Sequence, residues 1–560
     1  MPSQQSIERA MIQEPLEWSI QGPFAGVQSD CSLDKISMAL PGFWSADNVL
    51  FMQDKALFAP GWLALPAVAD GNPIVGVYDF FDNKAVHRQF VLTTRNLYLW
   101  SPTTGVWSAA VTAGVALGGI GSQRFAFTVV NNQVLFSQGV DPVQSWDGAA
   151  VTFAAVSPDA VPAYYLTEVK GHLIAGYTVE AGDPYPTRLR WTAAGDPSVW
   201  IPPAGGTTDL LNSRGFITAL ANIRQYGWAF QYAGVTQIVP TGVGTAPFAY
   251  EDYGGQDEGC THPSSFALFG HSEAVYANWG DIIHFDGTNF NNLSYSKAQD
   301  VNGKVFARGA RTRIYQDLLR ATSVNDVVSI GIVDHYGTKL KAYLLSITTP
   351  SQATDVLWIY NFDEDNWSRL RYNTDGPLTL LGRFYNEAPN TSPYPVSDWD
   401  FVGAPNQFAF TQAVTKAAAG GSPYALVAVK NTSAVAQLWT FGARASLSQV
   451  FITGIIDCGI PHVTKTLTGV YLDIVDVSVG AQPTYAVTVY NEKGQNVSLS
   501  SVSPGTGSGD LMRVYIPATK LNALFFTVKL SIDSASGGLA RPVVARIALQ
   551  YILGGKFKNA

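Results

Sequence analysis

Charged side chains are scarce in this sequence. Lys and Arg number 35 and Asp and Glu 43, together 14% of the chain, whereas a typical soluble domain carries about 25%. Hydrophobic residues make up 47%, so there is enough apolar surface for a large core, and intrinsic disorder is excluded. The net charge of -8 disfavours a protein that binds nucleic acid through the charge of its whole chain.

Cysteine and histidine are also few. Cys31, Cys260 and Cys458 are far apart and odd in number, so we expect neither a disulfide framework nor a zinc site. The 7 His occur singly, without H-E-x-x-H spacing. The N-terminus lacks a charged segment followed by an apolar one, and no apolar run is long enough to cross a bilayer. We therefore expect synthesis in a cytoplasm and no membrane span.

Helical periodicity is nearly absent, and short alternating runs take its place. Residues 88–110, for example, place β-branched and aromatic residues on either side of short Asn, Pro and Gly turns. The 52 Gly and 31 Pro are spread between such runs along the chain. The sequence therefore predicts an all-β fold made of β-hairpins.

A repeat decides which all-β fold is expected. Residues that end a strand before a turn recur at steps of 46, 45, 48 and 46, and two further copies follow after 75 and 81 residues, which we attribute to insertions. These residues are Trp100, Trp146, Trp191, Val239, Phe285, Tyr360 and Phe441. A step of about 45 residues holds four short strands, the size of one propeller blade. The sequence predicts a β-propeller of six or so blades.

The aromatic residues of this repeat are expected to pack between blades, because one blade cannot cover both of its faces alone. This packing role is assigned to Trp100, Trp146, Trp191, Phe285 and Tyr360. The alternative is that the tryptophans form a platform on which sugars stack.

Three regions are predicted along the chain. Residues 67–455 form the propeller, with insertions near 296–322 and 373–424. Residues 1–66 form an extended N-terminal arm that supplies a strand to close the ring. Residues 456–560 contain longer alternating strands and predict a separate C-terminal β-sandwich.

The insertion at 296–322 is the one stretch with a helix-like composition, and it is basic. Its candidate contacts to a partner are Arg308, Arg311, Arg313 and Arg320. A contact to DNA is one alternative, and a solvated helix that covers one side of a blade is another.

No group of residues has the spacing of a catalytic site. Residues 270–274, G-H-S-E-A, approach the nucleophile-elbow pattern G-x-S-x-G but end in Ala and lie between two strands rather than at a strand-to-helix turn. We therefore expect no enzymatic activity and no cofactor.

Acidic residues gather in two turns. One turn is 363–365, and the other contains Glu251, Asp252, Asp257 and Glu258. Both have the residue types of a hard-cation site or of a glycosidase carboxylate pair. Exposed acidic turns explain them more simply, so no metal is expected.

The order of several turn motifs along the chain is distinctive. A Pro-Gly-Trp turn at 60–62 ends the N-terminal arm, LRWTAAGDPSVW follows at 189–200, and the Gly-Cys at 259–260 leads through a hairpin to the Phe-Asp-Gly turn at 285–287 and the basic insertion. Over roughly residues 30–470 this order resembles the tail nozzle, or packaged-DNA stabilisation, β-propeller proteins of short-tailed bacteriophages. The apolar residues 56–59 replace the charged arm usual before Pro-Gly-Trp, which leaves the partner of the arm open.

The resemblance implies a structural virion protein of the phage tail, synthesised in the cytoplasm of the host bacterium. Six copies would form a ring below the portal and adaptor, retain the packaged DNA and conduct it during ejection. The implied partners are the other copies, adaptor or portal proteins, tail fibres or tail tip, and DNA that passes without sequence-specific binding. Because a basic lining would grip phosphates, the acidic residues at 251–258 are the candidate lining of the channel.

Two other classes of function stay open. A propeller glycosidase would need two carboxylates facing one pocket, about 5 to 9 Å apart. A carbohydrate-binding adhesion protein of a phage tail would expose Trp and Tyr side chains in a concave groove, whereas a conduit would bury them between blades.

Overall fold

The computed structural model describes residues 16–553 with gaps. The gaps of five or more residues are 29–42, 109–116, 300–304, 334–340, 349–353, 386–423, 444–448, 476–482, 504–510 and 534–542, and shorter gaps lie between them. The protein is all-β, as the sequence predicts, and most strands belong to four-stranded antiparallel sheets.

Sheets 1 to 5 follow one another along the chain, and each pairs four consecutive strands in order. Their strands are β6 (Ile74–Phe81), β7 (His87–Thr93), β8 (Leu97–Ser101) and β9 (Val106–Trp107); β10 (Ala126–Val130), β11 (Gln133–Ser137), β12 (Gln144–Trp146) and β13 (Ala154–Ala155); β14 (Ala163–Val169), β15 (His172–Glu180), β16 (Asp183–Trp191) and β17 (Gly206–Asp209); β18 (Ile217–Ile223), β19 (Tyr226–Gln231), β20 (Gly234–Val243) and β21 (Ala246–Tyr253); and β22 (Ala267–Phe269), β23 (Glu273–Asn278), β24 (Asp281–Phe285) and β25 (Phe290–Asn292).

Sheets 6 and 7 have the same four-strand pattern with one difference each. The strands of sheet 6 are β28 (Val327–Val333), β29 (Lys341–Ile347), β30 (Thr354–Asn361) and β31 (Asn366–Asn373). The strands of sheet 7 are β32 (Leu378–Tyr385), β33 (Tyr424–Asn431), β34 (Ala436–Ala443) and the N-terminal strand β5 (Gly61–Ala64), which pairs with β34. Sheet 6 continues through β31 into further strands, so it is part of a 10-stranded sheet.

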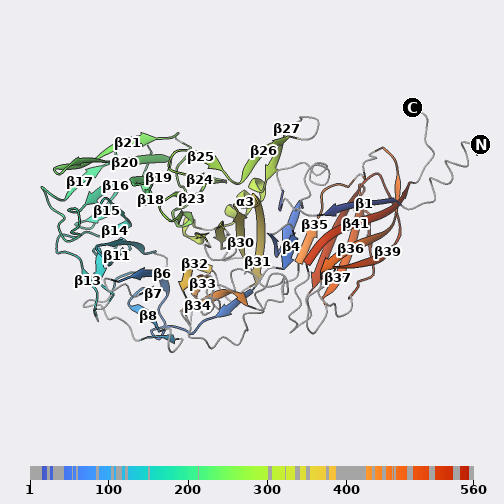
Figure 1. Ribbon diagram of the computed structural model, residues 1–560, viewed down its shortest axis with the longest axis horizontal. Helices are drawn as coiled ribbons and strands as arrows, with labels where there is room; N and C mark the ends of the chain where they lie inside the picture. Colours follow the sequence, from blue (N-terminus) through green and yellow to red (C-terminus); the bar gives the residue numbers. More distant parts are fainter. Residues whose placement is uncertain are drawn as a thin grey trace, which may run out of the picture.

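The seven sheets stand side by side in a propeller-like arrangement (Figure 1). First strands of neighbouring sheets contact each other, β10 with β14, β14 with β18, β22 with β28, β28 with β32, and β32 with β6. Continuous apolar clusters join sheet 1 to sheet 2 and sheet 4 to sheet 5. The neighbours therefore form a closed circle, and the first strand of each sheet faces its centre.

Every residue of the sequence repeat lies on the third strand of its sheet. Trp100 is on β8, Trp146 on β12, Trp191 on β16, Val239 on β20, Phe285 on β24, Tyr360 on β30 and Phe441 on β34. The period equals the length of one sheet with its turns. The longer step after Phe285 contains the hairpin of β26 (Tyr295–Gln299) and β27 (Val305–Gly309) and the helix α3 (Arg311–Leu318).

The helix-like composition of the insertion at 296–322 gives helix only in α3. Its first half pairs as the hairpin β26–β27, since Val305 and Phe306 favour extended backbone. Short 3-10 helices precede β22 and β28, at η1 (Pro263–Ser265) and η2 (Val324–Asp326). The other predicted insertion, 373–424, lies mostly outside the described residues.

One more sheet and the continuation of the 10-stranded sheet share one large apolar core and form a C-terminal unit beside the ring. One has the order β2-β35-β40-β37-β38, and the other contains β4-β41-β36-β39 with β1 paired to β41. Their strands are β1 (Leu16–Gln21), β2 (Ser45–Asp47), β4 (Lys55–Phe58), β35 (Gln449–Ile452), β36 (Lys465–Val475), β37 (Thr484–Asn491), β38 (Asn496–Ser498), β39 (Leu511–Ala523), β40 (Phe526–Asp533) and β41 (Val543–Leu553).

The N-terminal segment belongs to both units. Strands β1 and β2 pair inside the C-terminal sheets, and β5 completes sheet 7 of the ring. Between them, β3 (Val49–Met52) pairs with β31 of sheet 6, and β4 pairs with β41. These strands therefore tie the ring to the C-terminal unit.

None of the helices in the described ranges is long and apolar enough to cross a bilayer. Cys260 is a buried free thiol, and its burial raises the pKa to about 12. Cys458 is also buried, and Cys31 lies outside the described residues.

Candidate binding site at the centre of the ring

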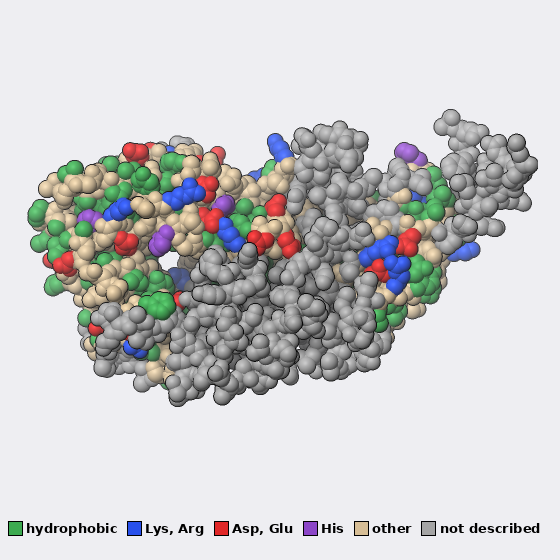
Figure 2. All heavy atoms as spheres, viewed as in Figure 1, with side chains coloured by type: hydrophobic (Ala, Val, Ile, Leu, Met, Phe, Trp, Pro, Cys, Tyr) green, Lys and Arg blue, Asp and Glu red, His purple; other side chains and the backbone are tan. Residues whose placement is uncertain are grey.

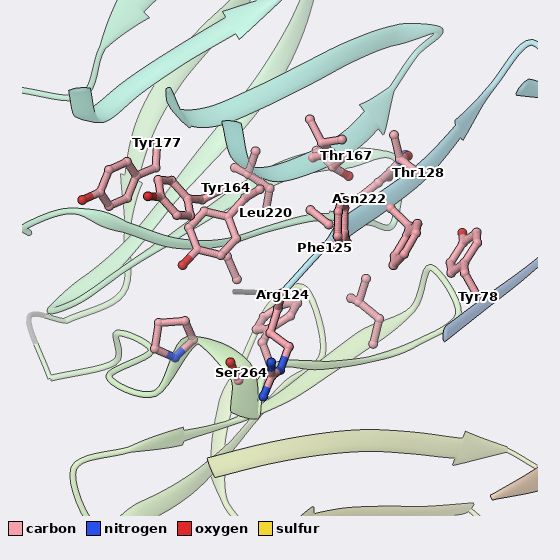
Figure 3. Close-up of a pocket in the computed structure, with 18 of the residues that line it drawn as sticks. Tyr78, Arg124, Phe125, Thr128, Tyr164, Thr167, Tyr177, Leu220, Asn222 and Ser264 are labelled. Carbon is pink, nitrogen blue, oxygen red and sulfur yellow. The ribbon is translucent and has the colours of Figure 1, made fainter. Parts of the chain in front are cut away.

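A cavity of about 990 Å³ lies among the first strands of sheets 1 to 6 (Figure 3). The first strand of each sheet faces the centre of the circle, so alternate side chains of six strands meet there. Its walls come from β6, β10, β14, β18, β22 and β28, together with Tyr177 of β15. Cavities of 300 to 1,000 Å³ are typical of small-molecule sites.

Aromatic side chains dominate one side of this cavity. The rings of Tyr78 and Phe127 stack at 4.8 Å, and those of Tyr164 and Tyr177 lie 4.6 Å apart. Burial raises the pKa of Tyr164, so its hydroxyl stays protonated at neutral pH. The wall therefore combines flat apolar faces with phenol groups that donate and accept hydrogen bonds.

Arg124 is the one Lys or Arg among the described residues that line the cavity, and it lies near Ser264 (Figure 3). Burial lowers the pKa of Arg124 to about 10, and the negative charge of Asp326 opposes that shift. Arg124 is therefore still a cation at neutral pH. Glu168 is the one carboxylate among the described residues that line the cavity, and it accepts a hydrogen bond from the backbone N–H of Gly171.

The residues assigned to packing between blades have different neighbours. Trp146 is 2% exposed, and its ring lies 5.6 Å from Phe80 and 5.8 Å from Phe90 of sheet 1. Phe285 is fully buried, with its ring 4.7 Å from Trp228 of sheet 4.

Of the other three assigned residues, Trp191 contacts a ring of the neighbouring sheet, whereas Trp100 and Tyr360 contact rings of their own sheets. Trp191 is half-buried and meets Phe248 of sheet 4 at 6.1 Å. Trp100 is half-buried, and its ring lies 5.1 Å from that of Trp107 in its own sheet. Tyr360 is buried and packs on Trp367, also within its own sheet.

The acidic residues proposed for a channel lie away from the central cavity. Glu251 and Asp252 are on β21, the fourth strand of sheet 4, and Asp257 and Glu258 are in the connection that follows. None of the four lines the cavity described here. A channel between copies of the chain is a different surface, so their role there stays a prediction.

The four arginines of the basic insertion are placed on or beside α3. Arg311 forms an ion pair with Asp281 at 2.6 Å, and Arg320 lies 3.5 Å from Asp317. Burial, followed by the charge of Arg369, lowers the pKa of Arg313. The side chain of Arg308, on β27, is outside what the structure describes.

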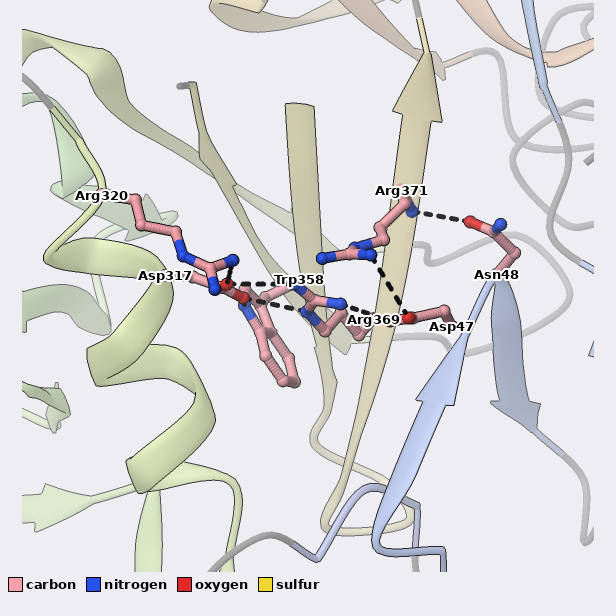
Figure 4. A network of polar contacts seen from close by, with 7 residues as sticks. All are labelled: Asp47, Asn48, Asp317, Arg320, Trp358, Arg369 and Arg371. Carbon is pink, nitrogen blue, oxygen red and sulfur yellow. Dashed lines mark hydrogen bonds and ion pairs between the residues drawn. The ribbon is translucent and has the colours of Figure 1, made fainter. Parts of the chain in front are cut away.

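A buried ion-pair network beside α3 has no sequence motif (Figure 4). Arg369 of β31 is 1% exposed and donates two hydrogen bonds to Asp317, at 2.9 and 3.0 Å. It also forms an ion pair with Asp47 of β2, and Trp358 donates to Asp317 at 3.1 Å. Burial lowers the pKa of Arg369, but the hydrogen bonds to Asp317 and Asp47 and the negative charges of these two carboxylates together raise the pKa overall. The network joins sheet 6, α3 and the C-terminal unit.

The remaining candidate motifs have structural partners. Ser272 of the G-H-S-E-A segment donates to the carbonyl of Phe269 at 2.8 Å, in the turn between β22 and β23. Asp365 accepts from Tyr360 at 2.7 Å, in the turn between β30 and β31. Within the described ranges, no three His, Cys, Asp or Glu side chains are grouped to hold a metal ion.

Opposite charges are mixed on the surface of the ring. Figure 2 shows acidic and basic side chains interspersed with uncharged ones over the described part of the ring on the face in view. The described part of the ring therefore has no broad cationic area for phosphate binding on that face.

No protein-family model matches this sequence, and no curated protein matches it. Solved structures match at low similarity. The extracellular domain of a one component system protein from B. thetaiotaomicron is 10% identical, with a TM-score of 0.37, and the match covers 87% of this chain and 63% of that chain. An α-L-arabinanase of Penicillium chrysogenum, complexed with arabinobiose, is 8% identical, with a TM-score of 0.29 over 69% of this chain and 98% of that one.

A third structure is dihydro-heme d1 dehydrogenase NirN, which is 9% identical, with a TM-score of 0.31 over 82% of this chain and 76% of that one. The chain thus spans less than two thirds of the bacterial extracellular domain. At these scores none of the three structures carries an argument about the function of this chain.

Proposed function

We propose that this chain is a structural subunit of the tail nozzle of a short-tailed phage. In this proposal the seven sheets are the blades of a closed propeller, and the two C-terminal sheets form a β-sandwich. Six copies form a ring below the portal and adaptor, retain the packaged DNA and conduct it during ejection.

The observation that carries the proposal is the coupling between the ring and the C-terminal unit. A conduit that holds DNA under pressure needs subunits whose parts do not hinge. Here β3 and β4 continue sheet 6 into the C-terminal unit, and the buried pair of Arg369 with Asp317 and Asp47 crosses the same junction. Large shared sheets and buried contacts oppose the relative motion that domain junctions ordinarily allow.

The size of the central cavity supports a lumen formed by several copies. At about 990 Å³ it is in the range of small-molecule sites, so a DNA duplex would have to pass between subunits. Two of the arginines that a DNA clamp would use, Arg311 and Arg320, already face Asp281 and Asp317. This pairing suits a lining that lets phosphates slide.

The alternative of a propeller glycosidase has less support. Such an enzyme needs two carboxyl groups about 5 to 9 Å apart on one pocket. Among the described lining residues of the cavity, Glu168 is the single carboxylate, and its hydrogen bond from Gly171 fixes it at a turn. The expected absence of enzymatic activity therefore remains part of the proposal.

The test uses phage particles that encode this chain. Mass spectrometry of purified particles should detect the chain, and antibodies to the C-terminal unit should label the tails in electron micrographs. Tail complexes released from the particles should contain a ring of this chain with an axial hole and a mass equal to several copies. Absence from the particles, or one copy per tail, would overturn the proposal.

A further inference from the structure

Five aromatic side chains form a continuous row that starts at the wall of the central cavity, and a sixth lies against the glycine that follows the last of them. This aromatic track consists of Tyr164, Tyr177, Phe216, Tyr232, Trp279 and Tyr315. Successive ring centroids lie 4.6, 6.5, 5.3 and 5.4 Å apart from Tyr164 to Trp279. The row of contacting rings ends at Trp279. Tyr315 of α3 is included because its ring lies against the next residue, Gly280, where a Cβ would be 2.6 Å from the ring.

The topology places these residues on one face of the ring. In an antiparallel sheet, the start of the first strand and the turn between the second and third strands lie at the same end. Phe216 immediately precedes β18, and Tyr232 follows β19, with its N–H bonded to the Phe216 carbonyl at 3.0 Å. Trp279 occupies the corresponding turn of sheet 5, and Tyr177 is near the end of β15. The contacts between rings then join sheets 3, 4 and 5.

The track is exposed where it leaves the cavity. Phe216 is 40%, Tyr315 45% and Trp279 60% exposed. Exposed large aromatic side chains that form a contiguous row, rather than single scattered residues, are typical of binding surfaces. At its inner end, Tyr164 and Tyr177 line the cavity beside Thr167 and across from Arg124 (Figure 3).

Two of these aromatic residues have a backbone that bulky side chains rarely adopt. Trp279 has φ of 51° and Tyr177 has φ of 51°, in the left-handed region. At Tyr177 the register between β15 and β16 shifts, which re-aims its side chain. Strain of this kind persists where the surroundings hold it and is concentrated at functional sites.

The charges beside the track disfavour single-stranded nucleic acid as its occupant. Aromatic platforms for single strands also need a cationic groove along the phosphates. Here Arg311 forms an ion pair with Asp281. Arg214 donates hydrogen bonds to the carbonyls of Val235 and Tyr253. Arg214 also lies 3.6 Å from Asp252. The flat faces are therefore suited to an uncharged ring system with hydroxyl groups.

We propose that the aromatic track and the central cavity bind an extended oligosaccharide. Sugar rings stack on Phe216, Tyr232 and Trp279, and the end of the chain enters the cavity. There the phenols and Thr167 meet its hydroxyl groups, and Arg124 binds a carboxylate on the terminal sugar. The inference does not depend on the nozzle assignment, because every residue in it belongs to one copy of the chain.

The first experiment identifies a ligand with the full-length protein. Labelled protein is applied to an array of bacterial surface oligosaccharides, and the strongest glycan is titrated while tryptophan fluorescence is recorded. We expect saturable binding with a change in fluorescence from Trp279. No binding to any glycan of the array overturns the proposal.

The second experiment assigns the surface with matched variants. Trp279→Ala and Phe216→Ala should each weaken binding about tenfold or more. Trp44→Ala, 42% exposed in the C-terminal unit, and Tyr226→Ala, 43% exposed at the opposite end of β19, should bind as the unaltered protein does. Circular dichroism and thermal melting check that all four variants fold.

The outcomes separate the possible occupants. If a glycan binds but the track variants bind it unchanged, the proposal is wrong. If Trp279→Ala abolishes only self-association, the track is a contact between copies and the proposal is also wrong. The contact between Arg124 and a carboxylate of the terminal sugar is tested with Arg124→Gln and with a glycan whose carboxyl groups are reduced to alcohols. Equal affinity for the reduced and the native glycan overturns the role of Arg124.

Discussion

The contact between sheets 4 and 5 and the junction between sheet 6 and the C-terminal unit are built in opposite ways. Sheets 4 and 5 meet through buried rings, with Trp228 on Phe285 at 4.7 Å and Phe230 on Tyr276 at 5.2 Å. The junction instead buries Arg369 between Asp317 and Asp47.

The two contacts have different physical properties. Apolar contacts are not directional and are proportional to the area buried, so one kind of contact can be repeated around a ring. A buried guanidinium, by contrast, is stable only where both carboxylates meet it in the right geometry. We infer that aromatic packing holds the repeated sheets together. The ion pairs of Arg369 instead hold the junction between sheet 6 and the C-terminal unit.

Loss of Arg369 should have the largest effect, because it removes the shorter ion pair from each of two carboxylates, the buried Asp317 and the half-buried Asp47. Asp317 then keeps Arg320 at 3.5 Å, and Asp47 keeps Arg371 at 3.8 Å. Arg369→Ala should lower the free energy of unfolding by about 3 to 5 kcal/mol, as measured by urea denaturation. Arg311→Ala removes an exposed pair with Asp281 and should cost about 1 kcal/mol or less. Equal effects of the two variants would break the distinction between the junction and the surface.

Trp146→Ala tests the apolar contact between sheets 1 and 2. We expect a loss of about 3 kcal/mol, at the low end for a large-to-small core change, because the Phe80 and Phe90 rings can close part of the cavity. Trp44→Ala, at a side chain that is 42% exposed, is the matched control and should change stability by about 0.5 kcal/mol or less. If Trp146→Ala has an effect no larger than this control, aromatic packing does not hold the sheets together.

The contact between sheets 5 and 6 combines the two types of contact, apolar packing and ion pairs. His284 and Lys341 contact Glu273, and the hydrogen bond from His284 is the main reason that the pKa of Glu273 falls from 4.5 to about 2. Its contribution is therefore complete above pH 4.5 and is lost as the pH falls toward 2.

Glu273→Gln should cost about 1 to 3 kcal/mol at neutral pH. The difference from the unaltered protein should shrink when urea denaturation is repeated between pH 4.5 and 2. A difference that stays constant over this range would show that Glu273 contributes through packing and not through its charge.

The smallest effect is expected at Trp279. Trp279→Gly removes an exposed ring. It also relieves the strain of the left-handed backbone at this position, because glycine adopts that conformation at no steric cost. We expect the free energy of unfolding to change by about 0.5 kcal/mol or less, and thermal unfolding measures this change through the shift of its midpoint. A clearly larger loss would assign the ring to packing rather than to a ligand surface.

The sequence predicted the repeated part of the molecule better than the parts that join it. Trp100 to Phe441 mark the third strands because each sheet repeats the same local pattern, and a local pattern is visible in one sequence. The sequence predicts that the N-terminal arm supplies a strand to close the ring, but it does not specify that this strand is β5 or that its partner is β34. These pairings, like that of β1 with β41, depend on contacts between distant segments, and no short-range signal specifies them.

The candidate sites show the same limit. Asp317 lies in the insertion whose basic composition predicts a contact to a partner. It is buried and forms an ion pair with Arg369. Trp279 directly follows β23, in the turn N-W-G-D, and is 60% exposed, whereas the tryptophans of the repeat lie on third strands. The Gly after it, which leaves room for the Tyr315 ring, was the one local sign that this turn differs.

The pairing of β5 with β34 also bears on how the chain folds during synthesis. Trp62 of β5 pairs with Phe441 of β34, so β5 leaves the ribosome roughly 20 to 75 s before its partner at 5 to 20 residues per second. During that interval sheets 1 to 6 are able to form in order while the apolar β5 waits unpaired. The ring is thus sealed last, and a chain that ends before residue 436 has no partner strand with which to seal it.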